Sequence, residues 1–129
     1  MAHLEKYQSN NNISLLAINE NDELVACINL NEIIHGVIQS AYLGYYAFAP
    51  HAGKGLMFQA MQKVIDYAFT DLQLHRLEAN IQPQNIRSKH LVTSLGFRIE
   101  GLSLRYLRIR NEWKDHERYA MTVEDVQQN

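Results

Sequence analysis

A strongly apolar segment, residues 41–48, leads through a turn with two glycines into an amphipathic helix over residues 55–70. Aromatic and aliphatic side chains fill 41–48, which is typical of a strand buried on both faces. Gly53 and Gly55 let a bulky anion approach the main chain, and the first N–H groups of a helix have no partners within it. The sequence therefore predicts a strand, turn and helix that bind phosphate, with a plain strand-to-helix turn as the alternative.

A second motif follows a second strand. Residues 77–81 have strand character and run through Pro83 toward Asn85 and a short apolar helix that ends at Gly96. Asn85 is a favourable N-cap and Gly96 a favourable residue just past the helix end. Capping explains the two ends of this helix. It does not explain why both motifs occur whole and in this order.

This order resembles the acetyl-CoA-dependent N-acetyltransferases of the GNAT superfamily. Their central motif reads Arg/Gln-x-x-Gly-x-Gly/Ala and is followed by Asn-x-x-Ser and Leu-Gly-Phe. Within the superfamily the chain is most similar to the bacterial ribosomal-protein N-terminal acetyltransferases of the RimJ and RimL kind, with RimJ the closer. The resemblance covers about residues 13–122, and the segments that carry it are 29–36, 41–45, 53–58, 74–76 and 113–116.

The resemblance implies an α+β (α/β) fold in a single domain over residues 1–129. Its sheet would be mixed and mostly antiparallel, with a central splayed pair of parallel strands and two main helices. It also implies acetyl-CoA as co-substrate. The expected cofactor-binding residues are Ala47, Phe48, Ala52, Gly53, Lys54, Gly55, Leu56, Met57, Asn85, Arg87 and Ser88.

Chemistry would take place where the two parallel strands diverge. The resemblance implies that pantetheine pairs there with the main chain near Ala47 and Phe48, as an added strand would. Ser88 is the candidate catalytic residue, donating to the leaving thiolate, and the alternative is that it is an exposed helix serine without a catalytic role.

Two residues depart from the family motif: Ala52 stands where the family has Arg or Gln, and Met57 where it has Gly or Ala. Because main-chain amides bind the phosphates, neither change removes the site.

The acceptor substrate is predicted from the lack of a convincing general base in the sequence. Glu32 and Glu78 are the available carboxylates, and neither is a convincing general base. A protein α-amine has an ordinary pKa of about 7.7–8.0, against about 10.4 for lysine, and so needs less help to lose its proton. We therefore expect acetyl transfer to a protein N-terminal amine of the ribosomal-protein type. The alternatives are a small amine or antibiotic acceptor, or a shortened module that binds CoA or self-associates without turnover.

Only twelve residues precede Ile13, where the family has a strand and one or two helices. An uncovered strand over 13–19 would leave main-chain groups and apolar side chains exposed. A two-fold contact buries such a surface with one patch. The sequence therefore predicts a homodimer with the N-terminal third in its interface.

Composition narrows the class of protein. A chain of 129 residues suits one core, and a net charge of −2 with scattered Lys and Arg argues against direct nucleic-acid binding. Cys27 is the only cysteine, which fits a reducing cytoplasm. The longest apolar run, 41–50, is about half the length that spans a bilayer, so no membrane segment is expected. The six histidines lack metal-ligand spacing, so no metal is expected.

Periodicity and turn residues predict the remaining layout. Residues 14–19 and 24–31 should form antiparallel strands, and strand 75–81 should run parallel to strand 41–48. A closing hairpin is expected from 104–110 and 113–123 around Asn111-Glu112. The polar ends, 1–12 and 124–129, are expected to be mobile.

Overall fold

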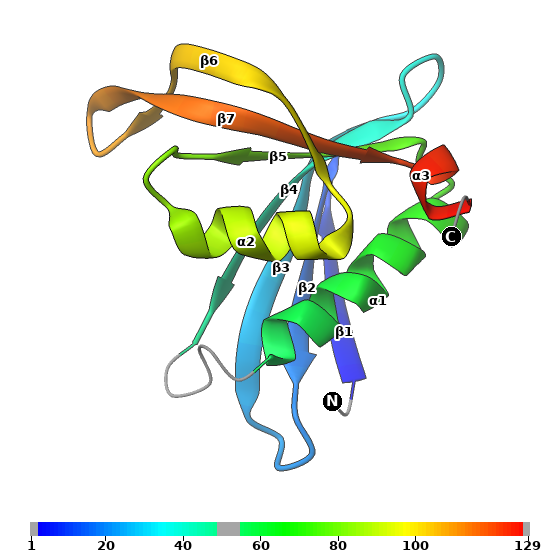
Figure 1. Ribbon diagram of the computed structural model, residues 1–129. Helices are drawn as coiled ribbons and strands as arrows, with labels where there is room; N and C mark the ends of the chain where they lie inside the picture. The colour runs from blue at the N-terminus through cyan, green and yellow to red at the C-terminus, as the bar shows by residue number, and fades with distance from the viewer. Residues whose placement is uncertain (1–2, 49–54, 128–129) are drawn as a thin grey trace.

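The computed structural model describes residues 3–48 and 55–127, in which seven strands form one sheet and three helices accompany it (Figure 1). The strand order is β1-β2-β3-β4-β5-β7-β6. In chain order the elements are β1 (His3–Ser9), β2 (Asn12–Ile18), β3 (Leu24–Ile34), β4 (Ser40–Ala47), α1 (Leu56–Thr70), β5 (Arg76–Ile81), α2 (Ile86–Leu95), β6 (Arg98–Ile109), β7 (Glu112–Thr122) and α3 (Val123–Gln127).

One face of the sheet carries the hydrophobic core. Alternate residues of β5 are buried, as the period-2 geometry of a strand requires; these are Leu77, Ala79 and Ile81. Helices α1 and α2 both lie on this face (Figure 1). The side of α1 that packs on it consists of Ala60, Met61, Val64, Ile65, Ala68 and Phe69.

The two central strands, β4 and β5, are parallel, as predicted for residues 41–48 and 75–81. They pair at three positions only, from Ser40 with Arg76 to Tyr42 with Glu78. Beyond that point β4 stays with β3, and β5 stays with β7 along its whole length. The carboxyl ends of β4 and β5 therefore diverge, and the expected splayed pair is confirmed.

The N-terminal prediction is wrong. Within residues 1–12, His3–Ser9 forms strand β1, which pairs with β2 along its full length through a turn at Asn10. Its side chains are mostly exposed and polar, and only Leu4 packs on the core. A strand exposed on both faces carries no apolar alternation, so periodicity could not reveal it. The strand predicted over 13–19 is thus paired on both sides, which removes the reason given for a dimer through the N-terminal third.

The C-terminal hairpin also differs in detail. β6 is continuous from Arg98 to Ile109, with register shifts near Gly101 and Arg105, instead of beginning again at 104. The turn lies at Arg110 and Asn111, both with positive φ (53° and 67°), as a two-residue type I′ turn requires. It therefore comes one residue earlier than predicted. Residues 124–127, expected to be mobile, belong to helix α3.

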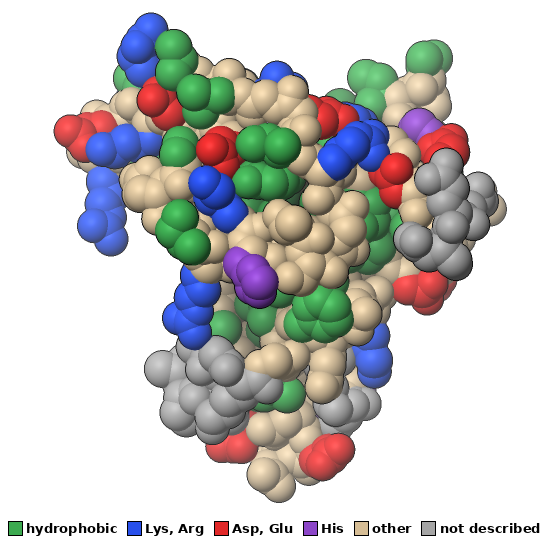
Figure 2. Space-filling view, in the orientation of Figure 1, with side chains coloured by type: hydrophobic (Ala, Val, Ile, Leu, Met, Phe, Trp, Pro, Cys, Tyr) green, Lys and Arg blue, Asp and Glu red, His purple; other side chains and the backbone are tan. Residues whose placement is uncertain are grey.

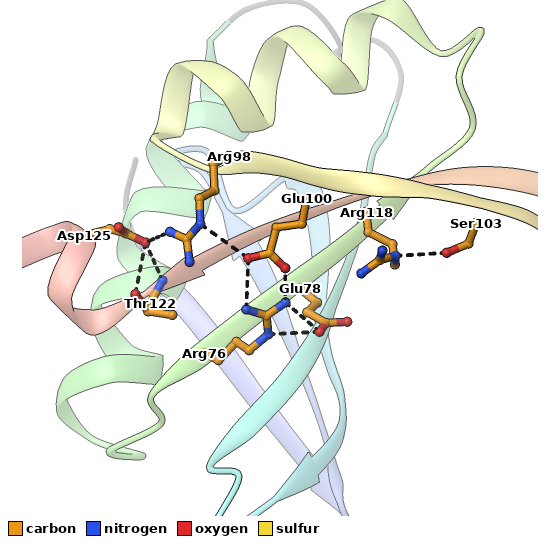
Figure 3. Close-up of polar contacts among 8 residues, drawn as sticks. All are labelled: Arg76, Glu78, Arg98, Glu100, Ser103, Arg118, Thr122 and Asp125. Atoms are coloured by element: carbon orange, nitrogen blue, oxygen red, sulfur yellow. Dashed lines mark hydrogen bonds and ion pairs between the residues drawn. The ribbon is translucent and has the colours of Figure 1, made fainter.

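Ion pairs link β5, β6 and α3 at the end of the sheet formed by β7 and β6 (Figure 3). Arg76 on β5 reaches across β7 to Glu100 on β6, with Nη2 2.5 Å from Oε1, and also bonds Glu78. Arg98 on β6 pairs with Glu100 and with Asp125 of α3. The hydrogen bonds from Arg76 hold the pKa of the Glu100 carboxyl below its usual value, against the opposing effect of burial.

In the part of the chain described here, no helix has the length and hydropathy needed to cross a membrane.

Candidate active site at the splayed strands

The divergence of β4 and β5 opens a cavity of about 280 Å³ between them. The facing strands contribute its apolar walls, and the β6–β7 hairpin closes one side with Leu107 and Ile109. Its other lining residues are Leu43, Gly44, Tyr45, Ala79, Asn80, Ile81, Gln82, Asn85, Ser88 and His116.

A larger cavity of about 580 Å³ lies between the end of β4, the start of α1 and one side of α2. This volume is within the range of sites that hold small molecules and cofactors. It is lined by Tyr45, Tyr46, Ala47, Gly55, Met57, Phe58, Asn85, Arg87, Ser88, His90, Leu91 and Ser94. Tyr45, Asn85 and Ser88 line both cavities, so the two spaces meet at these three side chains.

The start of α1 opens onto the larger cavity. Gly55 is its N-cap, with φ 76° and ψ −2°, and no side chain caps the helix. The first turn has no acidic residue. The unpaired N–H groups and the positive end of the helix dipole therefore favour an anion at this position. Of the residues predicted to bind the cofactor, Ala52, Gly53 and Lys54 lie outside the described residues.

Asn85 and Ser88 are held together at the start of α2. The Ser88 N–H donates to Asn85 Oδ1 at 3.2 Å, which confirms Asn85 as the predicted N-cap. This bond uses the carbonyl oxygen of the Asn85 side chain as a cap. Its amide nitrogen is the atom that can donate to a ligand. The Gly96 C-cap, at φ 104°, is also confirmed.

The Tyr45 hydroxyl lies beside Ser88. Its oxygen is buried and makes no hydrogen bond of good geometry with any described residue. Burial raises the pKa of this phenol, and the neighbouring Ser88 hydroxyl lowers it by a smaller amount. Tyr45 therefore keeps its proton at neutral pH and presents an O–H donor where the two cavities meet.

The main chain of β4 is unpaired on the side that faces the gap. Phe48 donates its N–H to Val25 O of β3 at 3.0 Å, so this amide is used within the sheet. Successive N–H groups of a strand point to opposite edges, which directs the Ala47 N–H away from β3. Ala47 can therefore pair with a ligand in the gap. Phe48 does not line either cavity, and its ring packs edge-on against Tyr46.

Comparison with known proteins agrees with this arrangement. Residues 1–98 match the family model described as "Acetyltransferase (GNAT) domain". The chain belongs to the GNAT acetyltransferase family. Its mixed sheet and splayed strand pair are the fold that was expected from the sequence.

Three GNAT relatives show how far the likeness extends. The chain is 38% identical over 107 residues to the Bacillus subtilis protein named "Probable N-acetyltransferase YjcK", covering 83% of this chain and 59% of the relative. It is 38% identical over 103 residues to the Escherichia coli "[Ribosomal protein uS5]-alanine N-acetyltransferase", covering 80% and 53%. The solved structure "Mycobacterium smegmatis RimJ in complex with CoA-disulfide" superposes with a TM-score of 0.84 at 33% identity, covering 90% of this chain and 55% of that one. The chain thus spans slightly more than half the length of these relatives.

Most of the cofactor-binding residues predicted for this GNAT chain gather at the larger cavity. Those that line it are Ala47, Gly55, Met57, Asn85, Arg87 and Ser88. Leu56 instead packs against the core. The two carboxylates considered as bases lie elsewhere: Glu78 is paired with Arg76 at 2.9 Å, and neither Glu78 nor Glu32 lines either of the two cavities described above.

Sequence reasoning missed three polar residues of the smaller cavity, Asn80, Gln82 and His116. Asn80 lies on β5 with a buried, unpartnered Oδ1. His116 is 3% exposed, and its Nδ1 is 2.9 Å from the carbonyl oxygen of Lys114. Strand alternation places Asn80 opposite the core, on the side of Glu78, but no local pattern indicates that the strands part there. Among the described residues, no group of three or more His, Cys, Asp or Glu side chains is arranged to hold a metal ion.

Proposed function

We propose that this chain forms the acetyl-CoA-binding and acetyl-transfer part of an N-acetyltransferase that acts on protein N-terminal amines. One observation carries the proposal. The cavity at the start of α1 and the cavity between the splayed strands meet at Tyr45, Asn85 and Ser88. A reaction between two substrates needs two sites that converge on one point, with hydrogen-bond donors at that point.

The residues of the larger cavity suit acetyl-CoA. The main-chain amides at Gly55 and Met57 would hold phosphate oxygens, and Arg87 adds a positive charge on the opposite wall. The unpaired edge of β4 at Ala47 would pair with the amide groups of pantetheine. Acetyl-CoA supplies an acetyl group activated as a thioester.

The donors at the junction suit the departing thiolate. Ser88 carries a hydroxyl there, and the Tyr45 hydroxyl lies beside it with its proton retained. Either O–H can donate a hydrogen bond or a proton to the sulfur as its bond to the acetyl carbon breaks. The predicted role of Ser88 therefore has a second donor next to it.

The nature of the acceptor follows from the groups around the smaller cavity, which contains no carboxylate among its lining residues. About 9–17% of an α-amine with an ordinary pKa of 7.7–8.0 is already neutral at pH 7, against about 0.04% of a lysine side chain. An α-amine can therefore react without a strong base. The similarity to the uS5-alanine acetyltransferase supports the same acceptor class.

Titration calorimetry and thermal unfolding test the proposal. Acetyl-CoA should bind and raise the Tm, whereas ATP and NAD should do much less, because they lack the pantetheine that pairs with β4. A peptide with a free N-terminal alanine should be acetylated faster than its N-terminally blocked form carrying a lysine. Absence of binding heat at millimolar acetyl-CoA would refute the cofactor assignment. Binding without transfer to the peptide would favour a small-amine acceptor or a module without turnover.

We also propose that the chain self-associates, through a surface other than the one first expected. Several large apolar side chains of edge strand β6 are more than half exposed, among them Ile99, Leu102 and Leu104, and hydrophobic side chains are visible at the surface over β6 and β7 (Figure 2). Exposed apolar surface on an edge strand favours pairing with a second chain. Light scattering at micromolar concentration should report twice 14.9 kDa, and Leu102→Asp should restore the single-chain mass. A single-chain mass for the parent protein would reject the dimer.

A further inference from the structure

Two buried side-chain oxygens stand out among the described residues because neither makes a hydrogen bond of good geometry. They are Tyr45 Oη and Asn80 Oδ1. Nearly all buried polar groups in native proteins are paired, so each orphan needs an explanation. Both residues line the same cavity between the diverging strands. The missing partners are therefore explained together if a polar ligand occupies that cavity.

A second asparagine on the same face of the sheet does have a hydrogen-bond partner, so the unpaired oxygen is particular to Asn80. Asn29 lies on the same face of the sheet as Asn80, because it is opposite Gly44 of β4 while Tyr42 is opposite Glu78. Its Oδ1 accepts a hydrogen bond from Ser14 Oγ at 2.7 Å. Asn80 has the same chemistry without such a partner.

The chemistry of the atom limits what it can bind. A side-chain carbonyl oxygen only accepts hydrogen bonds, so its partner must be an N–H or O–H donor. Asn80 lines the smaller cavity and is absent from the larger one, where the cofactor is proposed to bind. Although other polar side chains line this cavity, none of the described residues donates a hydrogen bond to Asn80 Oδ1.

We propose that Asn80 Oδ1 accepts a hydrogen bond from an N–H of the acceptor amine, an inference that rests on the acetyl-transfer function proposed above. A neutral primary amine has two N–H groups and one lone pair. With one N–H on Asn80, the lone pair is free to face the junction at Tyr45 and Ser88. Asn80 thereby sets the position and the direction of attack of the acceptor.

The test compares Asn80→Leu with Asn29→Leu as a matched control. The probe is a peptide with a free N-terminal alanine, titrated into protein saturated with CoA. Asn80→Leu should weaken peptide binding and lower kcat/KM for the peptide by about 10- to 100-fold, with the Kd of acetyl-CoA unchanged. Its Tm without ligands should equal or exceed that of the parent, since an apolar group replaces an unsatisfied one. Asn29→Leu should lower the Tm and leave peptide binding and kinetics unchanged. Asn80→Ala serves if the leucine variant does not fold.

Each contrary outcome has a distinct meaning. Unchanged peptide binding in Asn80→Leu overturns the inference, and so does an equal weakening of acetyl-CoA, which would assign Asn80 to the cofactor. A Tm loss as large as that of Asn29→Leu, with normal kinetics, would make Asn80 structural. If the parent binds the peptide without acetylating it, the proposed function fails, yet loss of peptide binding in Asn80→Leu still supports this inference. If the parent does not bind the peptide at all, both proposals fail.

Discussion

Substitutions at Gly55 separate two reasons for a glycine at the start of α1. Its φ of 76° is strained for residues with a side chain, but a Cβ placed there meets no atom within 4 Å. The folding cost is therefore one of backbone strain alone. Alanine in this conformation costs about 1–2 kcal/mol, which lowers the Tm by about 4–10 °C for a chain of this size. Valine should cost more, and asparagine less because it tolerates positive φ.

Acetyl-CoA binding should follow a different order, since Gly55 lines the larger cavity and an added side chain enters it. Size then decides: Gly55→Ala should bind better than Gly55→Asn, and Gly55→Val should lose about 10- to 100-fold in affinity as amide-to-phosphate hydrogen bonds are blocked. Denaturant unfolding gives the stability series, and calorimetry the binding series. Gly36, with φ 88° and equal free space, is the matched control. Gly36→Ala should be destabilised like Gly55→Ala and bind acetyl-CoA normally.

Two results would refute this reasoning. If Gly55→Ala unfolds at the same denaturant concentration as the parent while Gly36→Ala does not, Gly55 does not require a positive φ in the folded protein. If Gly55→Val binds acetyl-CoA as the parent does, the cofactor does not approach the start of α1.

Three further predictions concern the junction and the sheet edge. Ser88→Ala should lower kcat by about 100-fold with little change in acetyl-CoA affinity, as steady-state kinetics can measure. If kcat falls only when Tyr45→Phe is added, the two hydroxyls substitute for each other. Asn85→Ala should lose about 0.5–2 kcal/mol of stability with its cap and bind acetyl-CoA less well, whereas Asn85→Asp, which keeps the cap oxygen but not the amide donor, should lose binding only. The lowered pKa of Glu100 means that its pairing with Arg76 stabilises the fold above the usual carboxyl pKa of 4.5, and that this stability is lost as the pH falls through the folded-state pKa. Urea midpoints measured from pH 6 to pH 3 should therefore fall more steeply for the parent than for Glu100→Gln.

The sequence was most informative where local geometry and burial agree. Helical spacing of apolar residues located α1 to within one residue, and Asn85 and Gly96 marked both ends of α2 because capping depends only on nearby main-chain atoms. The crossover through α1 made β4 and β5 parallel neighbours. Polar strand β1 was missed because it lies at an edge and has little apolar surface to bury.

The sequence by itself determined the order of the elements from β2 to β7 and the family. Apolar periodicity, helix caps, the glycine turn before α1 and the Asn-x-x-Ser motif of α2 are all local features, which is why they could be recognised without the fold. Only the tertiary structure decided where β4 and β5 part, because the strands separate when each pairs with a different outer neighbour, β3 or β7. That separation sets Asn80 beside the space shared with Tyr45 and leaves both oxygens without partners. A polar side chain becomes part of a site when segments distant in the sequence bury it without giving it a hydrogen-bond partner. The local sequence around such a residue cannot predict this arrangement.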